Sequence, residues 1–362
     1  MRCGVGDYTE RLAKSLCDYT DIDVSVLTST MNVPIPLSTG PDLYPVMATW
    51  GPRGLRDFWF AMRRIQPDIL HIQFPTQGYG RVDGLRWIPW ISRVFRRVPV
   101  VLTWHEYVPG DQPAILRCMY SMAMAASALI VVRPDYAQKM PKLMRLFLGR
   151  TPVRFIPNVS NLPSILIRSE ERQAIRERLG CGESKIIAHF GFVFAHKGTD
   201  LLFRIADPKQ HHLLIIGELL ATDAYHARLL ELAAAPEWKG KVTVTGFVEA
   251  EDAARFLAIS DAVVFPHVNG GGGWNTSLHA AVCQGTFVLT TSTERSGYDP
   301  VANIYYAPPQ AVDHMRQALV SYAGMRNMNP VDATESWQAL AAAHITLYRS
   351  VCGVGRNLKA SL

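Results

Sequence analysis

Paired cysteines, long apolar runs and a leader-like N-terminus are all missing from this sequence. Its six cysteines are scattered, with no CxxC pair, at Cys3, Cys17, Cys118, Cys181, Cys283 and Cys352. This spacing argues against a zinc site or a disulfide framework and is typical of a reducing cytoplasm. Residues 1–20 lack the apolar core of a signal peptide. The longest stretch almost free of polar residues, 120–132, is too short to span a bilayer.

Two further absences limit the function. No GxGxxG pattern follows a strand candidate, which argues against a nicotinamide-dependent dehydrogenase. There is no long basic run and no recognised nucleic-acid-binding motif, so nucleic acid is not an expected partner. The net charge of +6 favours other anionic partners, such as nucleotides, phosphates or acidic lipid headgroups.

Short apolar, β-branched runs alternate with helical runs along the whole chain. The strand candidates are 23–29, 68–74, 99–104, 128–132 and 153–157 in the first half, and 185–193, 212–219, 241–248, 261–268, 286–291 and 304–309 in the second. Most of these runs are continuously apolar, which is typical of parallel strands covered on both faces. The pattern predicts an α/β protein with two Rossmann-like, doubly wound parallel-sheet domains.

The predicted domains are 1–160 and 161–332, followed by a C-terminal helix and tail, 333–362. A linker-like stretch and a charged run, within 157–184, separate the two halves. In the tail, apolar side chains recur at helical spacing, and we expect this helix to pack back toward the N-terminal domain. These positions are Trp337, Leu340, Ala341, His344, Leu347 and Tyr348.

The stretch VNGGGGWNTSLHAAVCQG, residues 268–285, is the strongest sign of a binding site. It follows an apolar strand candidate, and its four glycines free the backbone before Asn275, Thr276 and Ser277 offer N-cap chemistry to a helix. A glycine loop between a strand and a helix N-terminus can bind an anion through backbone N–H groups. The alternative is a surface loop with a good helix cap.

Lys197 is a second candidate, in the turn that follows strand candidate 185–193. A lysine in such a turn can reach a phosphate in a cleft as a point charge. The alternative is a solvated surface lysine, which is the commoner position for a single lysine.

Ten segments, each weak alone, occur in the order found in the retaining, nucleotide-sugar-dependent glycosyltransferases of family 4. They include GVGDYTERLA (4–13), VLTWHEY (101–107), FGFVFAHKGTDLL (190–202) and SLHAAVCQGTFVLTT (277–291). The sequence resembles this family over nearly its whole length. The resemblance implies the GT-B fold, in which two Rossmann-like domains face a cleft. It also implies transfer of a hexose-type sugar, with retention, to a polysaccharide, lipopolysaccharide or lipid-linked acceptor.

The resemblance implies roles for individual residues. Gly4 and Gly6 match the family's glycine loop beside the donor diphosphate and sugar, and His105 matches the histidine that touches the transferred sugar. A capped histidine at a strand end is the alternative for His105, and a structural role is preferred for His71. Lys197 matches the lysine that neutralises the diphosphate leaving group. Because GT-B enzymes rely on helix dipoles and cations for this charge, we expect no metal and no other cofactor.

The sequence departs from the family at the arginine that normally accompanies this lysine. Phe192 occupies that position, five residues before Lys197, and Arg295 is a candidate replacement for the lost cation. The sequence therefore keeps only one of the two cations that the family uses to neutralise the diphosphate.

The family's paired glutamates are also missing. Alignment on Gly285 places Gly272 and Ala280 at their positions, as in branches that carry a glycine- and serine-rich loop instead. Asn269 or His279 could take over the carboxylate roles. The residues expected to bind the donor are therefore Gly4, Gly6, Lys197, Gly272, Gly273, Asn275, Thr276, Ser277 and His279. These losses leave a second function open, a non-catalytic subunit that binds nucleotide sugars.

Tryptophan and arginine are concentrated in GLRWIPWISRVFRRVPVV, residues 84–101. A regular helix would place five apolar side chains on one side, with four arginines elsewhere: Trp87, Trp90, Ile91, Val94 and Phe95. Such a helix suits the surface of an anionic membrane. The alternative is a helix packed on the N-terminal sheet. Residues 84–98 are thus a candidate for peripheral contact with the inner face of the cytoplasmic membrane, in a protein otherwise expected in the cytoplasm.

The glycine loop at 4–6 raises one more expectation. Members of the family carry a strand just before this loop, whereas only three residues precede Gly4 here. That strand would lie in the middle of a parallel sheet, where its loss exposes unpaired backbone on both neighbours. We therefore expect either a natural start upstream of residue 1 or an N-terminal sheet that lacks its first, central strand.

Overall fold

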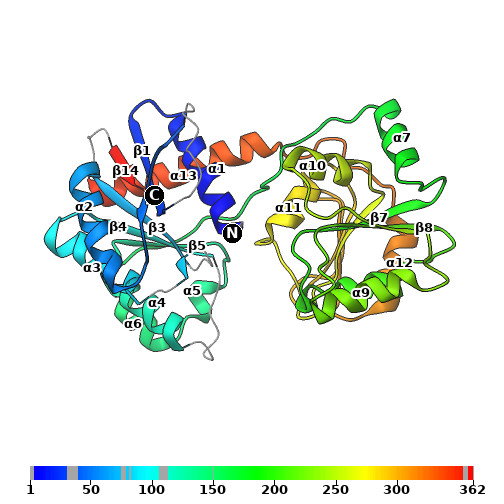
Figure 1. Ribbon diagram of the computed structural model, residues 1–362, viewed down its shortest axis with the longest axis horizontal. Coiled ribbons are helices and arrows are strands. Elements are labelled where there is room, and N and C mark those ends of the chain that lie inside the picture. Colours follow the sequence, from blue (N-terminus) through cyan, green and yellow to red (C-terminus); the bar gives the residue numbers. More distant parts are fainter. Residues whose placement is uncertain are drawn as a thin grey trace. The chain divides into compact units, whose positions relative to one another are not determined.

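The computed structural model describes residues 4–30, 40–74, 79–80, 83–105, 113–149, 151–353 and 358–361. The chain forms two compact units (Figure 1). Unit 1 comprises Met1–Pro157 and Trp337–Leu362, and unit 2 comprises Asn158–Ser336. Each unit contains one mostly parallel sheet with helices packed against it, so the expected α/β architecture is confirmed.

The sheet of unit 1 has seven strands, and its pairings are parallel throughout the part of the chain that is described. From edge to edge they are β2 (Asp42–Met47), β1 (Ile22–Ser29), β14 (Leu358–Ser361), β3 (Ile69–Phe74), β4 (Val100–Trp104), β5 (Ala128–Val131) and β6 (Val153–Phe155). The helices are α1 (Gly4–Cys17), α2 (Leu55–Ile65), α3 (Ile88–Trp90), α4 (Pro113–Ala125), α5 (Tyr136–Lys139), α6 (Lys142–Leu148) and α13 (Ala333–Cys352).

The middle of this sheet holds a strand that the sequence did not predict. No strand precedes α1 within the described residues, but the C-terminal strand β14 lies between β1 and β3. Leu358 pairs with Ile22 of β1, and Ala360 pairs with Ile69 of β3. The expectation of an empty central position is therefore corrected, because β14 supplies the backbone partners that β1 and β3 need.

Strand β3 is buried on both faces, and its two faces differ in chemistry. Leu70, Ile72 and Phe74 belong to an apolar core shared with α2 and α4. The alternate residues His71 and Gln73 lie in a buried polar layer beneath α1 and α13. The predicted apolar side of the C-terminal helix is confirmed, since all six of its positions are buried in α13.

The sheet of unit 2 also has seven strands, of which only β12 is antiparallel among the described residues. From edge to edge they are β12 (Gly297–Asp299), β13 (Ile304–Ala307), β11 (Val288–Thr291), β10 (Ala262–Phe265), β7 (Lys185–Phe190), β8 (His211–Ile216) and β9 (Val242–Val244). The helices are α7 (Ser169–Arg178), α8 (Leu202–Ile205), α9 (Ala224–Ala234), α10 (Ala250–Ile259), α11 (Thr276–Val282) and α12 (Val312–Tyr322).

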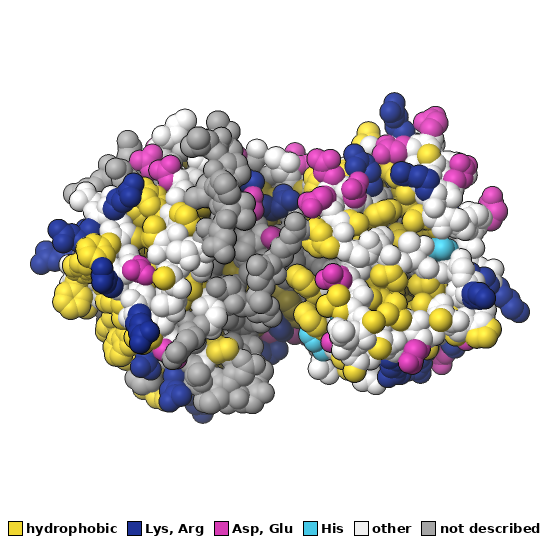
Figure 2. Space-filling view, viewed as in Figure 1, with side chains coloured by type: hydrophobic (Ala, Val, Ile, Leu, Met, Phe, Trp, Pro, Cys, Tyr) yellow, Lys and Arg dark blue, Asp and Glu magenta, His cyan; other side chains and the backbone are white. Residues whose placement is uncertain are grey.

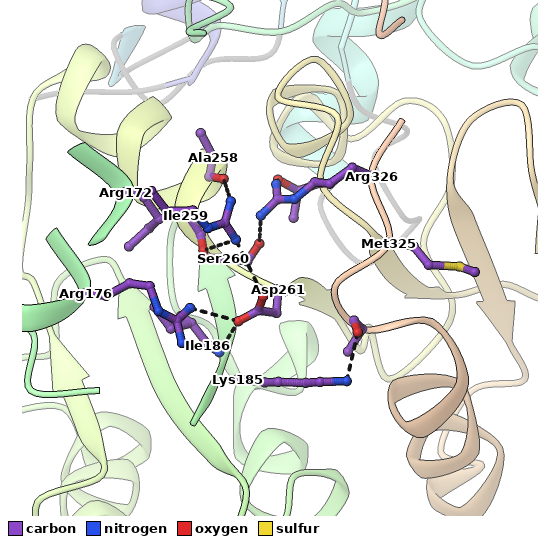
Figure 3. A network of polar contacts seen from close by, with 12 residues as sticks. Arg172, Arg176, Lys185, Ile186, Ala258, Ile259, Ser260, Asp261, Met325 and Arg326 are labelled. Carbon is purple, nitrogen blue, oxygen red and sulfur yellow. Dashed lines mark hydrogen bonds and ion pairs between the residues drawn. The ribbon is translucent and has the colours of Figure 1, made fainter. Parts of the chain in front are cut away.

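A cluster of cations around one carboxylate fastens the amino-terminal edge of this sheet (Figure 3). Asp261, just before β10, accepts from Arg176 at 3.1 Å, from Arg172 at 3.5 Å and from the Ile186 N–H at 2.8 Å. Arg172 and Arg326 also donate to carbonyls at the end of α10. Burial, with repulsion from Arg172, lowers the pKa of Arg326 to about 10. One carboxylate thus joins α7, β7 and β10.

Replacing Asp261 by Asn should lower the free energy of unfolding by about 2 kcal/mol, because it leaves Arg176 poorly paired in a half-buried setting. Urea unfolding at pH 7 measures this. Asp313→Asn is the matched control, since Asp313 is paired with Arg316 but its side chain is 93% exposed, and we expect a change within about 0.5 kcal/mol. Equal effects of the two substitutions would contradict the structural role of the cluster.

Candidate functional site

The candidate donor site lies at the carboxyl edge of the unit 2 sheet. Loops that leave parallel strands at this edge converge, which is where α/β sheets bind ligands. The loop after β7 contains Lys197, and the loop after β10 contains the four glycines and leads into α11. Both loops therefore lie at the carboxyl edge of one sheet, as the sequence predicted.

The two loops are in direct contact. The Val268 N–H donates to the His196 carbonyl at 3.1 Å. Gly198 has φ +69°, and a Cβ there would lie 2.3 Å from the Pro266 carbonyl oxygen. Only glycine combines this left-handed backbone with so close an approach. The turn that carries Lys197 is thus held against the start of the glycine loop.

The start of α11 is capped as expected. The Asn275 side chain accepts from the Ser277 N–H at 3.1 Å. Thr276 and Ser277 are half-buried in the first turn. The helix has only seven residues. It can therefore bind an anion through its backbone N–H groups rather than through a long helix dipole.

Several backbone donors of the loop are available to a ligand. Within the described residues, no hydrogen bond uses the N–H groups of Gly272, Gly273 or Thr276. Ser277 lies close to the first loop, since a Cβ on Gly191 would sit 2.9 Å from its Oγ. Unpaired N–H groups on both sides of Asn275, close to the Ser277 hydroxyl, suit the oxygens of a diphosphate.

His267 is hydrogen-bonded to the cap of α11, and sequence reasoning missed it. Its Nε2 lies 2.8 Å from Asn275 Nδ2, which donates to it. Burial, followed by the nearby charge of Lys197, lowers the pKa of His267 to about 3, so the ring is neutral at pH 7. A single histidine at the end of a strand gave no signal in the sequence beyond its position.

The other candidate site residues of unit 2 differ in their contacts and exposure. The His279 Nε2 donates to the Gly273 carbonyl at 2.6 Å, so this ring fixes the loop. Asn269 is exposed in the turn before the glycines. Arg295 lies over the Tyr306 ring, 5.5 Å from its centroid, and donates to its hydroxyl at 3.2 Å. Phe192 is 59% exposed and stacks on Phe194, with ring centroids 6.1 Å apart.

In unit 1, the segment expected to be a glycine loop is helical. Gly4 and Gly6 lie in the first turn of α1, which begins at Gly4. A Cβ on Gly4 would meet nothing within 4 Å. The following turn places Tyr8 edge-on to His105, with ring centroids 4.9 Å apart. The second turn of α1 and the carboxyl end of β4 are thus neighbours within this unit.

Gln73 fixes the protonation of His105. The His105 Nε2 lies 2.7 Å from Gln73 Oε1, and because an amide oxygen only accepts, Nε2 carries the hydrogen. Nδ1 is then the acceptor of the ring. Burial, followed by repulsion from His344, lowers the pKa of His105 to about 3. His105 is therefore neutral at pH 7 and can hydrogen-bond a hydroxyl, but it supplies no positive charge.

His71 lies in the polar layer with both ring nitrogens paired. Nδ1 lies 2.6 Å from the Tyr348 hydroxyl and Nε2 lies 2.7 Å from Thr103 Oγ1. Its neighbour His344 donates from Nδ1 to the Leu340 carbonyl at 2.8 Å. Burial lowers the pKa of both histidines, that of His344 to about 4. The layer joins α13 to β3 and β4.

These buried histidines should make the protein less stable in acid. A folded pKa below the unfolded value of about 6.5 means that the unfolded chain binds more protons, so stability falls as pH drops from about 6.5 toward 4. Between pH 7 and pH 5, each fully buried histidine should lower the free energy of unfolding by about 2 kcal/mol. Urea unfolding at both pH values tests this. His344→Phe should reduce the loss by about that amount, and an unchanged pH dependence would contradict the assignment.

The described residues also bear on metal binding and on membrane insertion. No group of three or more His, Cys, Asp or Glu side chains is placed there to hold a metal ion. In the same residues, none of the helices combines the length and the apolarity needed to cross a membrane.

Comparison with known proteins identifies the family. A glycosyl transferase 4-like domain model matches residues 3–159, and a model of glycosyl transferases group 1 matches residues 184–323. The chain belongs to the family 4-like glycosyltransferases. No match was found among curated proteins.

Solved structures of other proteins share the GT-B fold of this glycosyltransferase. Sucrose-phosphate synthase from Thermosynechococcus elongatus is 18% identical, with a TM-score of 0.70 over 96% of this chain and 94% of that one. A glycosyltransferase from Rickettsia africae is 11% identical, with a TM-score of 0.67 over 97% of each chain. HepE from Anabaena, solved with UDP and glucose, is 14% identical, with a TM-score of 0.61 over 91% of this chain and 98% of that one. At these identities the likeness establishes the fold.

Proposed function

We propose that this glycosyltransferase moves a hexose-type sugar, with retention, from a nucleoside-diphosphate sugar to a polysaccharide, lipopolysaccharide or lipid-linked acceptor. The observation that supports a diphosphate donor is the junction of two loops in unit 2. It packs the turn that carries Lys197 against the start of the glycine loop, which contains the His267–Asn275 hydrogen bond and the unpaired N–H groups. HepE was solved with UDP-glucose, which favours the same donor class.

The chemical role of these groups follows from where charge develops. When the sugar–phosphate bond loosens, negative charge builds up on the leaving diphosphate. Fixed N–H donors and the Lys197 ammonium stabilise that charge without reorganising, which lowers the barrier. In unit 1, neutral His105 is proposed to hydrogen-bond a hydroxyl of the transferred sugar. Because cations and N–H groups take the charge, we expect turnover to survive EDTA.

The observation that favours a non-catalytic alternative is the shortage of charged groups. Phe192 presents an exposed ring where the family has an arginine, and Gly272 and Ala280 replace the two carboxylates. A subunit that binds nucleotide sugars without transferring them would tolerate these changes.

Turnover separates the two proposals. The purified chain is incubated with uridine-, guanosine- and thymidine-diphosphate sugars, with and without lipid and glycan extracts, and nucleoside diphosphate release is measured. Release that depends on one donor supports transfer. A thermal shift with a donor but no release under any condition would instead support the binding subunit.

A further inference from the structure

The Trp- and Arg-rich segment of unit 1 is divided between the core and the solvent. It consists of a 3-10 turn (Leu85–Trp87), α3 and a π turn (Ile91–Phe95). The five apolar residues that the sequence placed on one side of a regular helix therefore do not all lie on the same side. Trp90 donates to the Ser121 carbonyl at 3.0 Å, and Ile91 packs on the apolar core. Trp87, Val94 and Phe95 remain 47%, 61% and 69% exposed.

Helix α2 extends this exposed apolar surface. The Trp59 ring meets the Phe95 ring edge-on, with centroids 6.4 Å apart, and Phe60 is 56% exposed. We call the surface formed by half-buried Trp59 and by exposed Phe60, Trp87, Val94 and Phe95 the aromatic face. In Figure 2, hydrophobic and basic side chains mingle at the left edge of unit 1, where Figure 1 places α2 and α3.

Arginines lie over the rings of the aromatic face. The guanidinium carbon of Arg86 is 5.1 Å from the Trp87 ring centroid, and that of Arg56 is 5.7 Å from the Phe60 centroid. Arg96 lies over Trp59 at 5.8 Å. Aromatic rings with neighbouring cations suit the surface of an anionic bilayer. The rings insert at the boundary of the acyl chains, while the cations stay beside the lipid phosphates.

A basic pocket adjoins the aromatic face. It has a volume of about 520 Å³, and Arg93, Arg96 and Arg97 contribute to its lining together with Ser127 and one carboxylate, Asp68. Arg96 belongs to both features, because its guanidinium also covers Trp59. Three arginines outweigh the single aspartate, so the pocket suits an anionic group.

The pocket is separate from the candidate site of unit 1. Asp68, Pro99 and Ser127 in its lining directly precede β3, β4 and β5, whereas His105 follows β4. In a parallel sheet these are opposite edges. A ligand in the pocket would therefore bind apart from the His105 site.

We propose that unit 1 docks on an anionic membrane through the aromatic face, with a lipid headgroup phosphate in the pocket of Arg93, Arg96 and Arg97. The net charge of +6 has the sign that such a surface attracts. A second copy of the chain fits this face less well. A two-fold interface would place the arginines of one copy near the arginines of the other, and the like charges would repel. This docking does not depend on the proposed sugar transfer.

The test is sedimentation of the full chain with vesicles of phosphatidylcholine alone or with about 30% phosphatidylglycerol. We expect binding to the anionic vesicles only, weakened as salt rises. Glycerol phosphate at millimolar concentration should not displace the protein, since a free phosphate lacks the bilayer that holds the aromatic face. Loss of binding under that competition would overturn the membrane as the source of the phosphate.

Two variants assign the binding to the two features. Arg96→Gln with Arg97→Gln should lower vesicle affinity about 25-fold, since each basic residue contributes about fivefold. Trp87→Ser with Phe95→Ser should lower it at least about 10-fold.

The controls are two exposed residues of unit 2, replaced as Val320→Ser and Arg178→Gln, which should leave vesicle affinity unchanged. Circular dichroism melting confirms that every variant is folded. As a measure independent of affinity, brominated lipids should quench the fluorescence of the wild-type chain more than that of Trp87→Phe. Equal binding to neutral vesicles, wild-type affinity in both double variants, or a dimer that the Trp87 and Phe95 changes dissolve would each overturn the proposal.

Discussion

Replacing Lys197 by alanine is expected to lower kcat/KM for sugar transfer by about 100- to 1,000-fold, most of it in kcat. Lys197 is half-buried in the turn held against the glycine loop, and its charge already reaches His267. A cation in this position interacts more strongly with the leaving diphosphate than with the intact donor. The loss should therefore appear in the chemical step, measured as nucleoside diphosphate release at saturating donor.

The matched control for this substitution is Lys239→Ala, an exposed lysine of the same unit that lies beyond α9. We expect it to leave turnover unchanged. A Lys197→Arg variant keeps the charge and should recover part of the rate. If Lys197→Ala retained wild-type kcat, the diphosphate would have to be neutralised elsewhere, and Arg295 would become the first cation to test.

Replacing Gly198 by alanine should lower the free energy of unfolding by about 3–4 kcal/mol. The backbone at Gly198 is left-handed, with φ +69°, and an added Cβ would lie 2.3 Å from the backbone oxygen of Pro266. An alanine therefore meets two penalties, the left-handed conformation and a clash with a carbonyl that cannot rotate away. Urea unfolding of the full chain at pH 7 measures the sum.

A second glycine separates those two penalties. Gly240 has a similar φ of +75°, but a Cβ there meets nothing within 4 Å. Gly240→Ala should therefore show only the conformational cost of about 1–2 kcal/mol. If both substitutions lowered the free energy of unfolding equally, the two loops would not be packed as closely as described. The proposed junction of Lys197 with the glycine loop would then lose its support.

The sequence predicted those parts of the fold that local periodicity determines. The buried side of α13 could be read from its helical spacing, from Trp337 to Tyr348, because every turn contributes an apolar residue. The placement of the glycine loop and Lys197 at one edge of the sheet could be predicted because parallel strands bring their carboxyl-end loops together there. In each case a pattern of neighbouring residues carries the information.

The features that were missed depend on distant partners or on irregular turns. The residues of β14, Leu358–Ser361, contain few β-formers, and their strand exists because β1 and β3 offer backbone partners on both sides. The grouping of Trp87 with Trp90 and Ile91 assumed a regular helix. Changes from 3-10 to α to π turns shift the angular position of each side chain, so that assumption failed.

Single polar residues gave the weakest signals. His267 matters because it meets Asn275, eight residues later, across a loop whose shape the sequence does not specify. Gln73 matters because it meets His105, which directly follows the neighbouring strand β4. Both contacts arise from tertiary packing, and neither residue type is unusual at its position in the chain.

Calorimetric titration of the full chain with UDP-, GDP- and TDP-sugars tests the central claim most directly, namely that the loops of unit 2 bind a nucleoside-diphosphate sugar. We predict that one donor class binds, that Lys197→Ala weakens its binding by about 3- to 10-fold, which leaves the larger part of the loss in kcat, and that Lys239→Ala binds like the wild type. Absence of binding by every donor, or equal affinity in wild type and Lys197→Ala, would contradict the account.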